Sequence, residues 1–211
     1  MKIAILTTPN QWFVPFAKEL KNNIINSKLF LNHQELKGSF DIVFILSYHN
    51  IIPAEFLAKN KHNIVIHASA LPQGKGWAPL FWQVLEGKDE IPFSMFEASN
   101  GVDNGDIYMQ KTLQLNGYEL NEDLRAKQAR FTINMCQEFI NNYEEYKIPN
   151  VQSGEENFYP KRTSKDSKLN VDKTIQEQFN LLRIVDNDEY PAFFEIDDNV
   201  YKLKIEKFND E

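Results

Sequence analysis

Cysteine, long apolar runs and an excess of positive charge are all missing from this sequence of 211 residues. Cys136 is the single cysteine, so an intramolecular disulfide is excluded, and its place in a predicted helix favours a buried apolar role over redox chemistry. No apolar run approaches the roughly 18 residues that span a bilayer, and the segment Met1–Thr8 has no signal-peptide cleavage site. We therefore expect a cytoplasmic protein that does not enter a membrane.

The charge balance limits the classes of partner. The formal net charge is −7, and the 23 Lys and Arg residues form no recognisable basic face, which argues against a general nucleic-acid binder. The Gly-x-Gly-x-x-Gly pattern of dinucleotide-binding folds is also missing, which disfavours NAD, and we expect no metal site. A composition of 42% hydrophobic and 25% charged residues is ordinary for a soluble globular protein.

Hydrophobic periodicity predicts strands and helices that alternate along the chain. This order is typical of an α/β fold, Rossmann-like, with a mostly parallel sheet and helices on both faces. The strands are expected at 2–7, 27–32, 41–47, 63–68, 93–98 and 107–115, and the helices at 11–23, 53–59, 79–85 and 119–146.

The chain divides at Pro149 into residues 1–150, expected to carry the chemistry, and an extension over residues 151–211. The extension begins as a polar connection and continues as a small helix over 171–185, with Asp172 as a plausible cap. A hairpin of strands 193–196 and 200–205 ends it. Because two strands alone form a marginal edge, the hairpin could pair with a second copy in a homodimer.

A lone histidine ends the most informative strand. Asn63 to Ala68 reads as a strand covered on both faces, with Val65 and His67 on one face, and His67 then lies at its carboxyl end, where α/β enzymes bind ligands. The alternative for His67 is a core histidine tied to a backbone carbonyl. Ser47 to Pro53 follows another strand and is expected at the same edge.

Asp103 lies in a glycine-rich turn between the next two strands, and the sheet could bring it to His67. A carboxylate beside an imidazole fixes the tautomer and stabilises the protonated ring, so the pair suits acyl transfer to an amine. The alternative for Asp103 is a plain turn former, because Asp-Asn-Gly is a common loop tripeptide.

Several motifs, in order, resemble the folate-dependent formyltransferases over residues 1 to about 185. The motifs are Asn50-Ile-Ile-Pro53, His67-Ala-Ser69-Ala-Leu71-Pro72, Gly76-Trp-Ala-Pro79 with Trp82, Val102-Asp103-Asn-Gly105-Asp106-Ile107 and Tyr159-Pro-Lys-Arg162-Thr. The resemblance implies 10-formyltetrahydrofolate as formyl donor, held by Asn50, Ile51, Ile52 and Val102. It also implies that His67 takes the proton of the attacking amine and supports the oxyanion, with Asp103 orienting it.

One position departs from the family pattern. The family usually has Asn two residues before the histidine, and here that position is Val65. Asn63 lies about 13 Å from His67 along an extended strand, too far to substitute. The oxyanion donor is then missing or comes from elsewhere, for instance Ser69, Asn50 or Gln83.

Within this resemblance, the acceptor is expected to be a nucleotide-linked amino sugar, such as a dTDP-4-amino-4,6-dideoxyhexose. A tRNA acceptor is disfavoured because the sequence ends before the tRNA-binding domain that some members carry. Purine synthesis is disfavoured because the loop 7–13 lacks a glycine pair for the substrate phosphate.

Four residues are the candidates for binding the acceptor: Ser69, Lys75, Trp77 and Tyr108. Lys75 is placed to meet a pyrophosphate, although a loop lysine is more often a solvated charge. Trp77 and Tyr108 could stack on a sugar or base, although aromatic side chains near a sheet are usually packing. Two other readings stay open: a protein that binds folate or a sugar nucleotide without turnover, and a formyltransferase that acts on another small amine.

Overall fold

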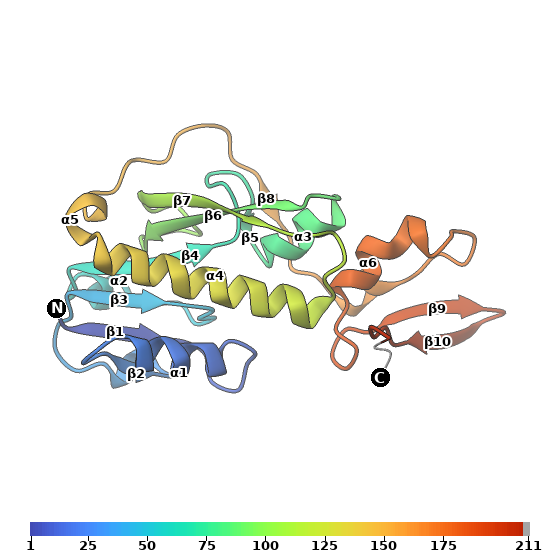
Figure 1. The fold of residues 1–211 in the computed structure, drawn as a ribbon, viewed down its shortest axis with the longest axis horizontal. Coiled ribbons are helices and arrows are strands. Elements are labelled where there is room, and N and C mark those ends of the chain that lie inside the picture. The colour runs from blue at the N-terminus through green and yellow to red at the C-terminus, as the bar shows by residue number, and fades with distance from the viewer. Residues whose placement is uncertain (209–211) are drawn as a thin grey trace.

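A six-stranded sheet organises the fold in this computed structural model, which describes residues 1–208 (Figure 1). The strand order is β2-β1-β3-β4-β6-β7. The first four strands run parallel, and β6 is antiparallel to both of its neighbours. The strands are β1 (Ile3–Leu6), β2 (Lys28–Phe30), β3 (Ile42–Ile45), β4 (His62–His67), β6 (Glu90–Glu97) and β7 (Ile107–Gln114). The predicted α/β fold with a mostly parallel sheet is confirmed.

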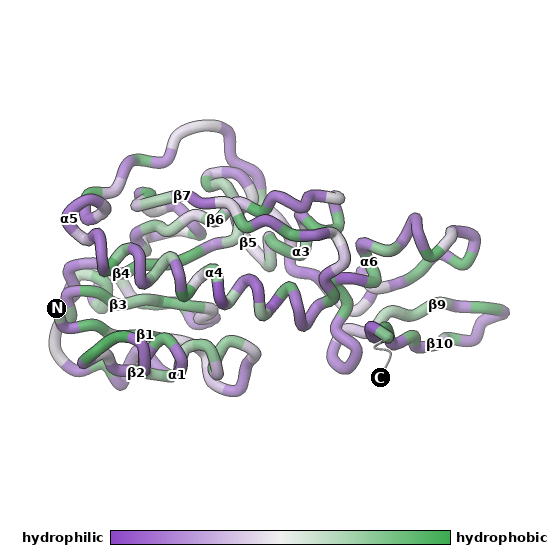
Figure 2. The backbone as a smooth tube through the Cα atoms, in the orientation of Figure 1, coloured by the Kyte–Doolittle hydropathy of each residue, from purple (hydrophilic) through white to green (hydrophobic). Residues whose placement is uncertain are grey.

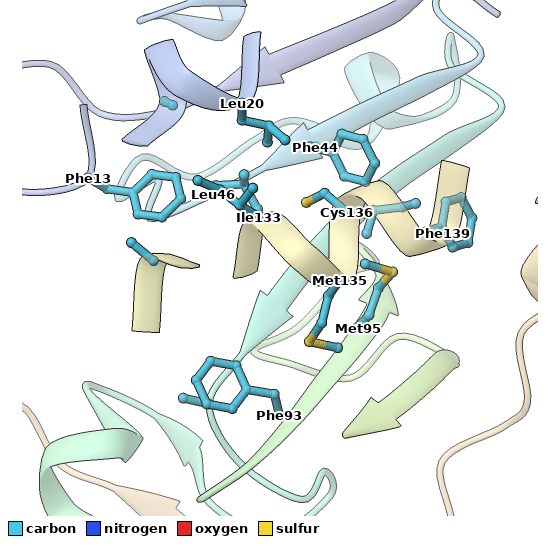
Figure 3. Packing of buried hydrophobic residues seen from close by; sticks show 14 of the residues in the cluster. Phe13, Leu20, Phe44, Leu46, Phe93, Met95, Ile133, Met135, Cys136 and Phe139 are labelled. Carbon is cyan, nitrogen blue, oxygen red and sulfur yellow. The ribbon is translucent and has the colours of Figure 1, made fainter. Parts of the chain in front are cut away.

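Helices α1 (Val14–Asn23) and α4 (Asn121–Asn141) cover one face of the sheet (Figure 1). Their apolar side chains meet those of the strands in the main core, where Phe44 and Phe139 pack edge to face (Figure 3). Cys136 lies fully buried in this core, and burial raises the pKa of its thiol. The cysteine is thus an apolar packing group, as its helical position predicted.

The opposite face carries a second, smaller core under α2 (Ala54–Leu57) and a short 3-10 helix (His33–Glu35). Val43, Ile45 and Val65 point to this face, where they pack with Phe40 and Phe56. Because both faces are covered, the parallel strands are almost continuously apolar, as the hydropathy colours of β1 and β3 show (Figure 2).

The helix expected over 119–146 is shorter and broken. It begins at Asn121, and the backbone of Asn142 leaves the helical region before the single turn α5 (Tyr143–Tyr146). Glu119 stays outside the helix because its buried carboxylate accepts hydrogen bonds from Lys127 and the Asn116 N–H and pairs with Arg183 at 3.2 Å. Burial alone raises the pKa of Glu119, but these hydrogen bonds outweigh it and bring the pKa to about 2.

The extension returns to the sheet before it forms its own elements. Its first part runs as a loop to β8 (Phe158–Tyr159) (Figure 1). This strand pairs in parallel with β5 (Lys75–Gly76), the short strand that precedes α3 (Pro79–Leu85) in the chain. The sequence did not predict this strand pair. Each strand has two residues, which are too few to show an alternation of apolar and polar side chains, and the two strands are distant from each other in sequence.

The helix expected over 171–185 is also shorter. Only α6 (Phe179–Ile184) is α-helical, preceded by 3-10 turns at Ser164–Ser167 and Gln176–Gln178. Asp172 is not its cap; its N–H binds the Asn170 side chain in a separate turn. The terminal hairpin is confirmed as β9 (Ala192–Ile196) and β10 (Asn199–Leu203), which project beyond α6 (Figure 1). No helix in the described part of the chain is long and apolar enough to cross a membrane.

Candidate active site

His67 is the last residue of β4, and its side chain shares a face with Val65, whereas Ile64 and Ile66 pack toward α4. Its Nε2 lies 2.8 Å from the carbonyl oxygen of Gly74. A carbonyl can only accept, so we assign the ring hydrogen to Nε2 and the lone pair to Nδ1. The imidazole is therefore held in one orientation with Nδ1 as its basic atom.

The loop after β4 is packed too tightly for side chains at its glycines. Gly74 has a φ of +72°, and a Cβ there would lie 2.8 Å from the Cβ of Ser69. A Cβ on Gly76 would lie 2.5 Å from the carbonyl oxygen of Tyr159. The two glycines thus let the loop place one carbonyl against His67 and run beside β8.

Asp103 reaches His67 by an indirect path. Because β6 is antiparallel, its carboxyl end lies beside Asn63, which is about 13 Å from His67 along β4. The turn doubles back over the sheet, and Asp103, with a φ of +51°, brings Oδ2 to 3.6 Å from His67 Nε2. The same oxygen accepts the N–H of Gly76 at 2.9 Å.

Gly105 makes this return possible, since a Cβ there would lie 1.5 Å from the carbonyl oxygen of Glu97. Gln152, in the extension, then fixes the turn: its Nε2 donates to the carbonyl oxygens of Asp103 at 2.8 Å and Gly105 at 2.6 Å. Sequence reasoning missed Gln152, because a polar residue in an aperiodic loop carries no signal of its partner.

Lys75 is buried, and its placement corrects the expected contact with a pyrophosphate. Its Nζ binds Glu156 Oε2 at 2.6 Å and the side-chain oxygen of Asn104. The ammonium is therefore neutralised inside the protein, where it joins the extension to the Asp103 turn. Glu156 and Asn104 are further positioning residues that sequence reasoning missed.

Tyr108 is also buried, so the expected stacking of its ring on a sugar or base is wrong. Its ring is buried, and its hydroxyl donates to Glu97 Oε2 at 2.6 Å and lies 2.9 Å from His62 Nδ1. Burial, followed by the bond to Glu97, raises its pKa. Trp77, by contrast, is 48% exposed, with its ring centroid 6.4 Å from that of His49.

The three candidate oxyanion donors differ in availability. Gln83 is buried, and its amide nitrogen donates to the carbonyl oxygens of Ala68 and Pro79. Ser69 is buried under the loop rather than at a surface, and its hydroxyl has no partner among residues 1–208. Asn50 is exposed, with its amide nitrogen 3.4 Å from the hydroxyl of Tyr48.

The residues expected to hold folate include two exposed apolar side chains. Ile51 is 93% exposed and Val102 is 59% exposed. Ile52 is half-buried and packs, with Val65, against the smaller core. Exposed aliphatic side chains in a loop at a strand end are suited to covering a flat ring system.

The two hollows described on the surface lie away from this site. Hollows of about 420 and 340 Å³ are lined by residues 168–171 with Glu195, and by residues around α2, and neither lining includes His67 or Asp103. Within the described residues, no three His, Cys, Asp or Glu side chains are grouped to hold a metal ion. The site therefore rests on the His67–Asp103 pair, whose side chains are 11% and 16% exposed.

Comparison with known proteins gives the family. The profile of the Formyl transferase family matches residues 6–140, and the chain belongs to this family. A methionyl-tRNA formyltransferase from Thermodesulfovibrio yellowstonii is 29% identical over 145 residues, which are 68% of this chain and 47% of that protein. The chain spans about half the length of the curated relatives it matches.

Solved structures share the fold. A methionyl-tRNA formyltransferase from Clostridium thermocellum superposes with a TM-score of 0.81 at 21% identity, covering 99% of this chain and 94% of that one. A sugar N-formyltransferase from Shewanella sp. gives 0.71 at 16% identity, with 100% of both chains covered. HypX from Aquifex aeolicus, in complex with tetrahydrofolic acid, gives 0.76 at 16% identity, covering 97% of this chain and 37% of HypX.

Proposed function

We propose that the chain is an N-formyltransferase that moves the formyl group of 10-formyltetrahydrofolate to the amine of a nucleotide-linked amino sugar. The observation that carries the proposal is the His67–Asp103 pair at 3.6 Å, in which both side chains are hydrogen-bonded to the loop after β4. Family membership over residues 6–140 supports formyl transfer as the reaction class.

The donor fits the residues at the end of β3 and in the Asp103 turn. Ile51 and Val102 offer exposed apolar surface, and Ile52 supports it from the smaller core. These three residues would hold the folate ring, with Asn50 available for a polar contact. When bound, 10-formyltetrahydrofolate supplies an activated formyl group.

His67 acts as the general base. Its Nδ1 accepts the proton that the amine loses as it attacks, while Nε2 stays bound to the Gly74 carbonyl. The Asp103 carboxylate then faces the positive imidazolium and stabilises it. General base catalysis of this kind contributes about 10² to 10⁴ in rate.

Two observations support a sugar nucleotide as the acceptor. A net charge of −7 disfavours a polyanionic tRNA, and Trp77 offers a half-exposed indole that can stack on a base or sugar. The sugar N-formyltransferase from Shewanella sp. shares the fold across the full length of both chains.

Incubation with 10-formyltetrahydrofolate and a panel of nucleotide-linked amino sugars tests the proposal. We expect one or more acceptors to gain the mass of a formyl group, and His67→Asn to lower turnover at least about a hundredfold with an unchanged circular dichroism spectrum. His62→Asn, at the opposite end of the same strand β4, is the matched control and should retain activity.

Three results would count against the proposal. Ligand binding without transfer across the panel would indicate a binding protein. Transfer to amines that carry no nucleotide would identify a different acceptor class. Unchanged turnover in His67→Asn would remove this residue from the mechanism.

A further inference from the structure

The carboxyl ends of β1 and β3 form the point where the strand order reverses. The chain leaves β1 toward α1 on one face and leaves β3 toward α2 on the other, so the two loops diverge here (Figure 1). Ligands of open α/β sheets bind at such points. The N–H of His49, after β3, donates to Thr8 Oγ1, after β1, and joins the two loops.

Arg125 approaches this point from the first turns of α4, whose amino-terminal end lies on the same side as the strand ends (Figure 1). Its guanidinium carbon lies 4.5 Å from the ring centroid of Trp12 and 4.3 Å from that of Phe81. Burial is the main cause that lowers its pKa to about 10, opposed by the more distant charges of Asp186 and Glu189.

The guanidinium of Arg125 has neither an ion pair nor a hydrogen bond to any residue from 1 to 208. A half-buried arginine is normally paired with a carboxylate, because its five donors lose water. Two aromatic rings hold the guanidinium in place, and its N–H donors are left to a group from outside the described residues. It is therefore pre-positioned for an external anion.

Two more basic groups surround the neighbouring Trp77. Lys161 Nζ lies 5.0 Å from the Trp77 ring centroid, and the His49 ring lies tilted beside the same indole with a centroid distance of 6.4 Å. Burial first, then the charges of Lys161 and Arg125, lower the pKa of His49, so the three basic side chains act on one another. In the described structure, neither Lys161 nor His49 has a carboxylate within ion-pair distance.

This concentration of uncompensated basic groups contrasts with the rest of an acidic chain. The two most deeply buried cations are paired: Lys75 with Glu156, and Arg183 with Glu119. Keeping like charges together without partners costs free energy, which a bound anion would recover.

We propose that Arg125, Lys161 and His49 bind the diphosphate of the acceptor, with the indole of Trp77 stacking on the attached base or sugar. This assignment rests on the proposed function for the identity of the acceptor. Two permanent cations match two phosphoryl groups, and the planar guanidinium can bind one of them in a bidentate manner.

The position relative to the reactive pair agrees with this assignment. Trp77 directly follows Gly76, whose N–H is bound by Asp103. An acceptor held at its phosphates beside Trp77 therefore extends its other end toward His67, and the folate residues Ile51 and Val102 remain free for the donor. The buried Lys75, which the sequence had suggested for this role, is replaced by groups from four separate segments.

Calorimetric titration at low ionic strength tests the site without any turnover. The probes are inorganic pyrophosphate, thymidine and uridine 5′-diphosphates, and the matching monophosphates. We expect diphosphates to bind more tightly than monophosphates, and Lys161→Gln and Arg125→Gln each to weaken diphosphate binding about tenfold to a hundredfold. Trp77→Ala should weaken the nucleoside diphosphates but leave pyrophosphate unchanged.

Matched variants separate a local effect from charge and folding. Lys18→Gln, an exposed lysine on α1, removes the same charge elsewhere and should leave binding unchanged. Arg125→Lys keeps the charge between the rings, so it should retain more affinity than Arg125→Gln. Lys161 is exposed, so its variant tests the site even where an Arg125 variant fails to fold.

Kinetics then distinguish this inference from the proposed function. With an accepted sugar nucleotide, Lys161→Gln should raise KM about tenfold or more and leave kcat within about twofold. Transfer with an unchanged KM in Lys161→Gln would overturn the site and leave the function standing. Diphosphate binding that is lost in Lys161→Gln, without formyl transfer to any sugar, would keep the site and refute the function. No pyrophosphate or nucleoside diphosphate binding by the wild type would overturn the site.

Discussion

Replacing Asp103 by Asn removes the negative charge of this residue but keeps its hydrogen bond to the backbone. An Asn side chain can still accept the N–H of Gly76, and Asn tolerates the left-handed backbone found here. The Gln152 contacts go to backbone carbonyls and are independent of the side chain. The turn should therefore keep its place while the carboxylate beside His67 is lost.

The expected loss follows from the geometry of the pair. At 3.6 Å, with both side chains mostly buried, a carboxylate and an imidazolium interact by about 4 kcal/mol at an effective dielectric constant of 20. At 1.36 kcal/mol per tenfold, this energy corresponds to about 10³ in kcat. Because the amide dipole recovers part of it, we expect Asp103→Asn to lower kcat by about 10² to 10³ with little change in KM.

The assay is formyl transfer to the best acceptor of the panel, followed by mass spectrometry under saturating substrates. Asp106→Asn is the control, because it removes one negative charge from the same turn without a contact to His67. A loss of less than about tenfold in Asp103→Asn, or an equal loss in both variants, would refute the electrostatic role of Asp103.

Three further predictions concern the turn, the buried ion pair and the altered strand position. Gly105→Ala places a Cβ against the carbonyl oxygen of Glu97, so kcat should fall at least about tenfold through displacement of the turn, although no reacting group is changed; wild-type kcat would contradict this. Glu119, paired with Arg183, has a folded pKa of about 2, below the unfolded value of about 4.3, so its stabilisation is full above pH 4.3 and lost as pH falls toward 2. Urea unfolding should show a loss on the order of 3 kcal/mol over that range, which Glu119→Gln should abolish while destabilising the protein at pH 7. Val65→Asn should lower the free energy of unfolding by about 1–2 kcal/mol because it buries an amide in the smaller core; unchanged stability would mean that a polar partner reaches this position.

The sequence predicted an element correctly where the residues of that element alone indicate its structure. The strand at 42–45 and the centre of the strand at 62–67, residues 64–66, are apolar and rich in β-branched residues, and α3 begins at a proline and ends before Gly87. His67 at a strand end, and the glycines beside it, could be located for the same reason. These features depend on backbone preference and on burial, which neighbouring residues already encode.

Long-range contacts decided what could not be predicted. The burial of Lys75 depends on Glu156, 81 residues away, and the burial of Tyr108 depends on His62, 46 residues away, as well as on Glu97 of the adjacent strand. The sequence of a glycine-rich loop does not distinguish an exposed lysine from a buried one, because burial depends on an acidic partner from another segment.

The sequence by itself therefore determined the α/β class, the strand that ends in His67, and the turn that holds Asp103. Only the tertiary structure decided that this turn folds back about 13 Å to meet His67, that Gln152 anchors it, and that Arg125 lies between two rings with no ion pair to residues 1–208. The physical reason is that periodicity and turn chemistry act within a few residues, whereas ion pairing and the direction of a loop depend on which distant segments share the same space.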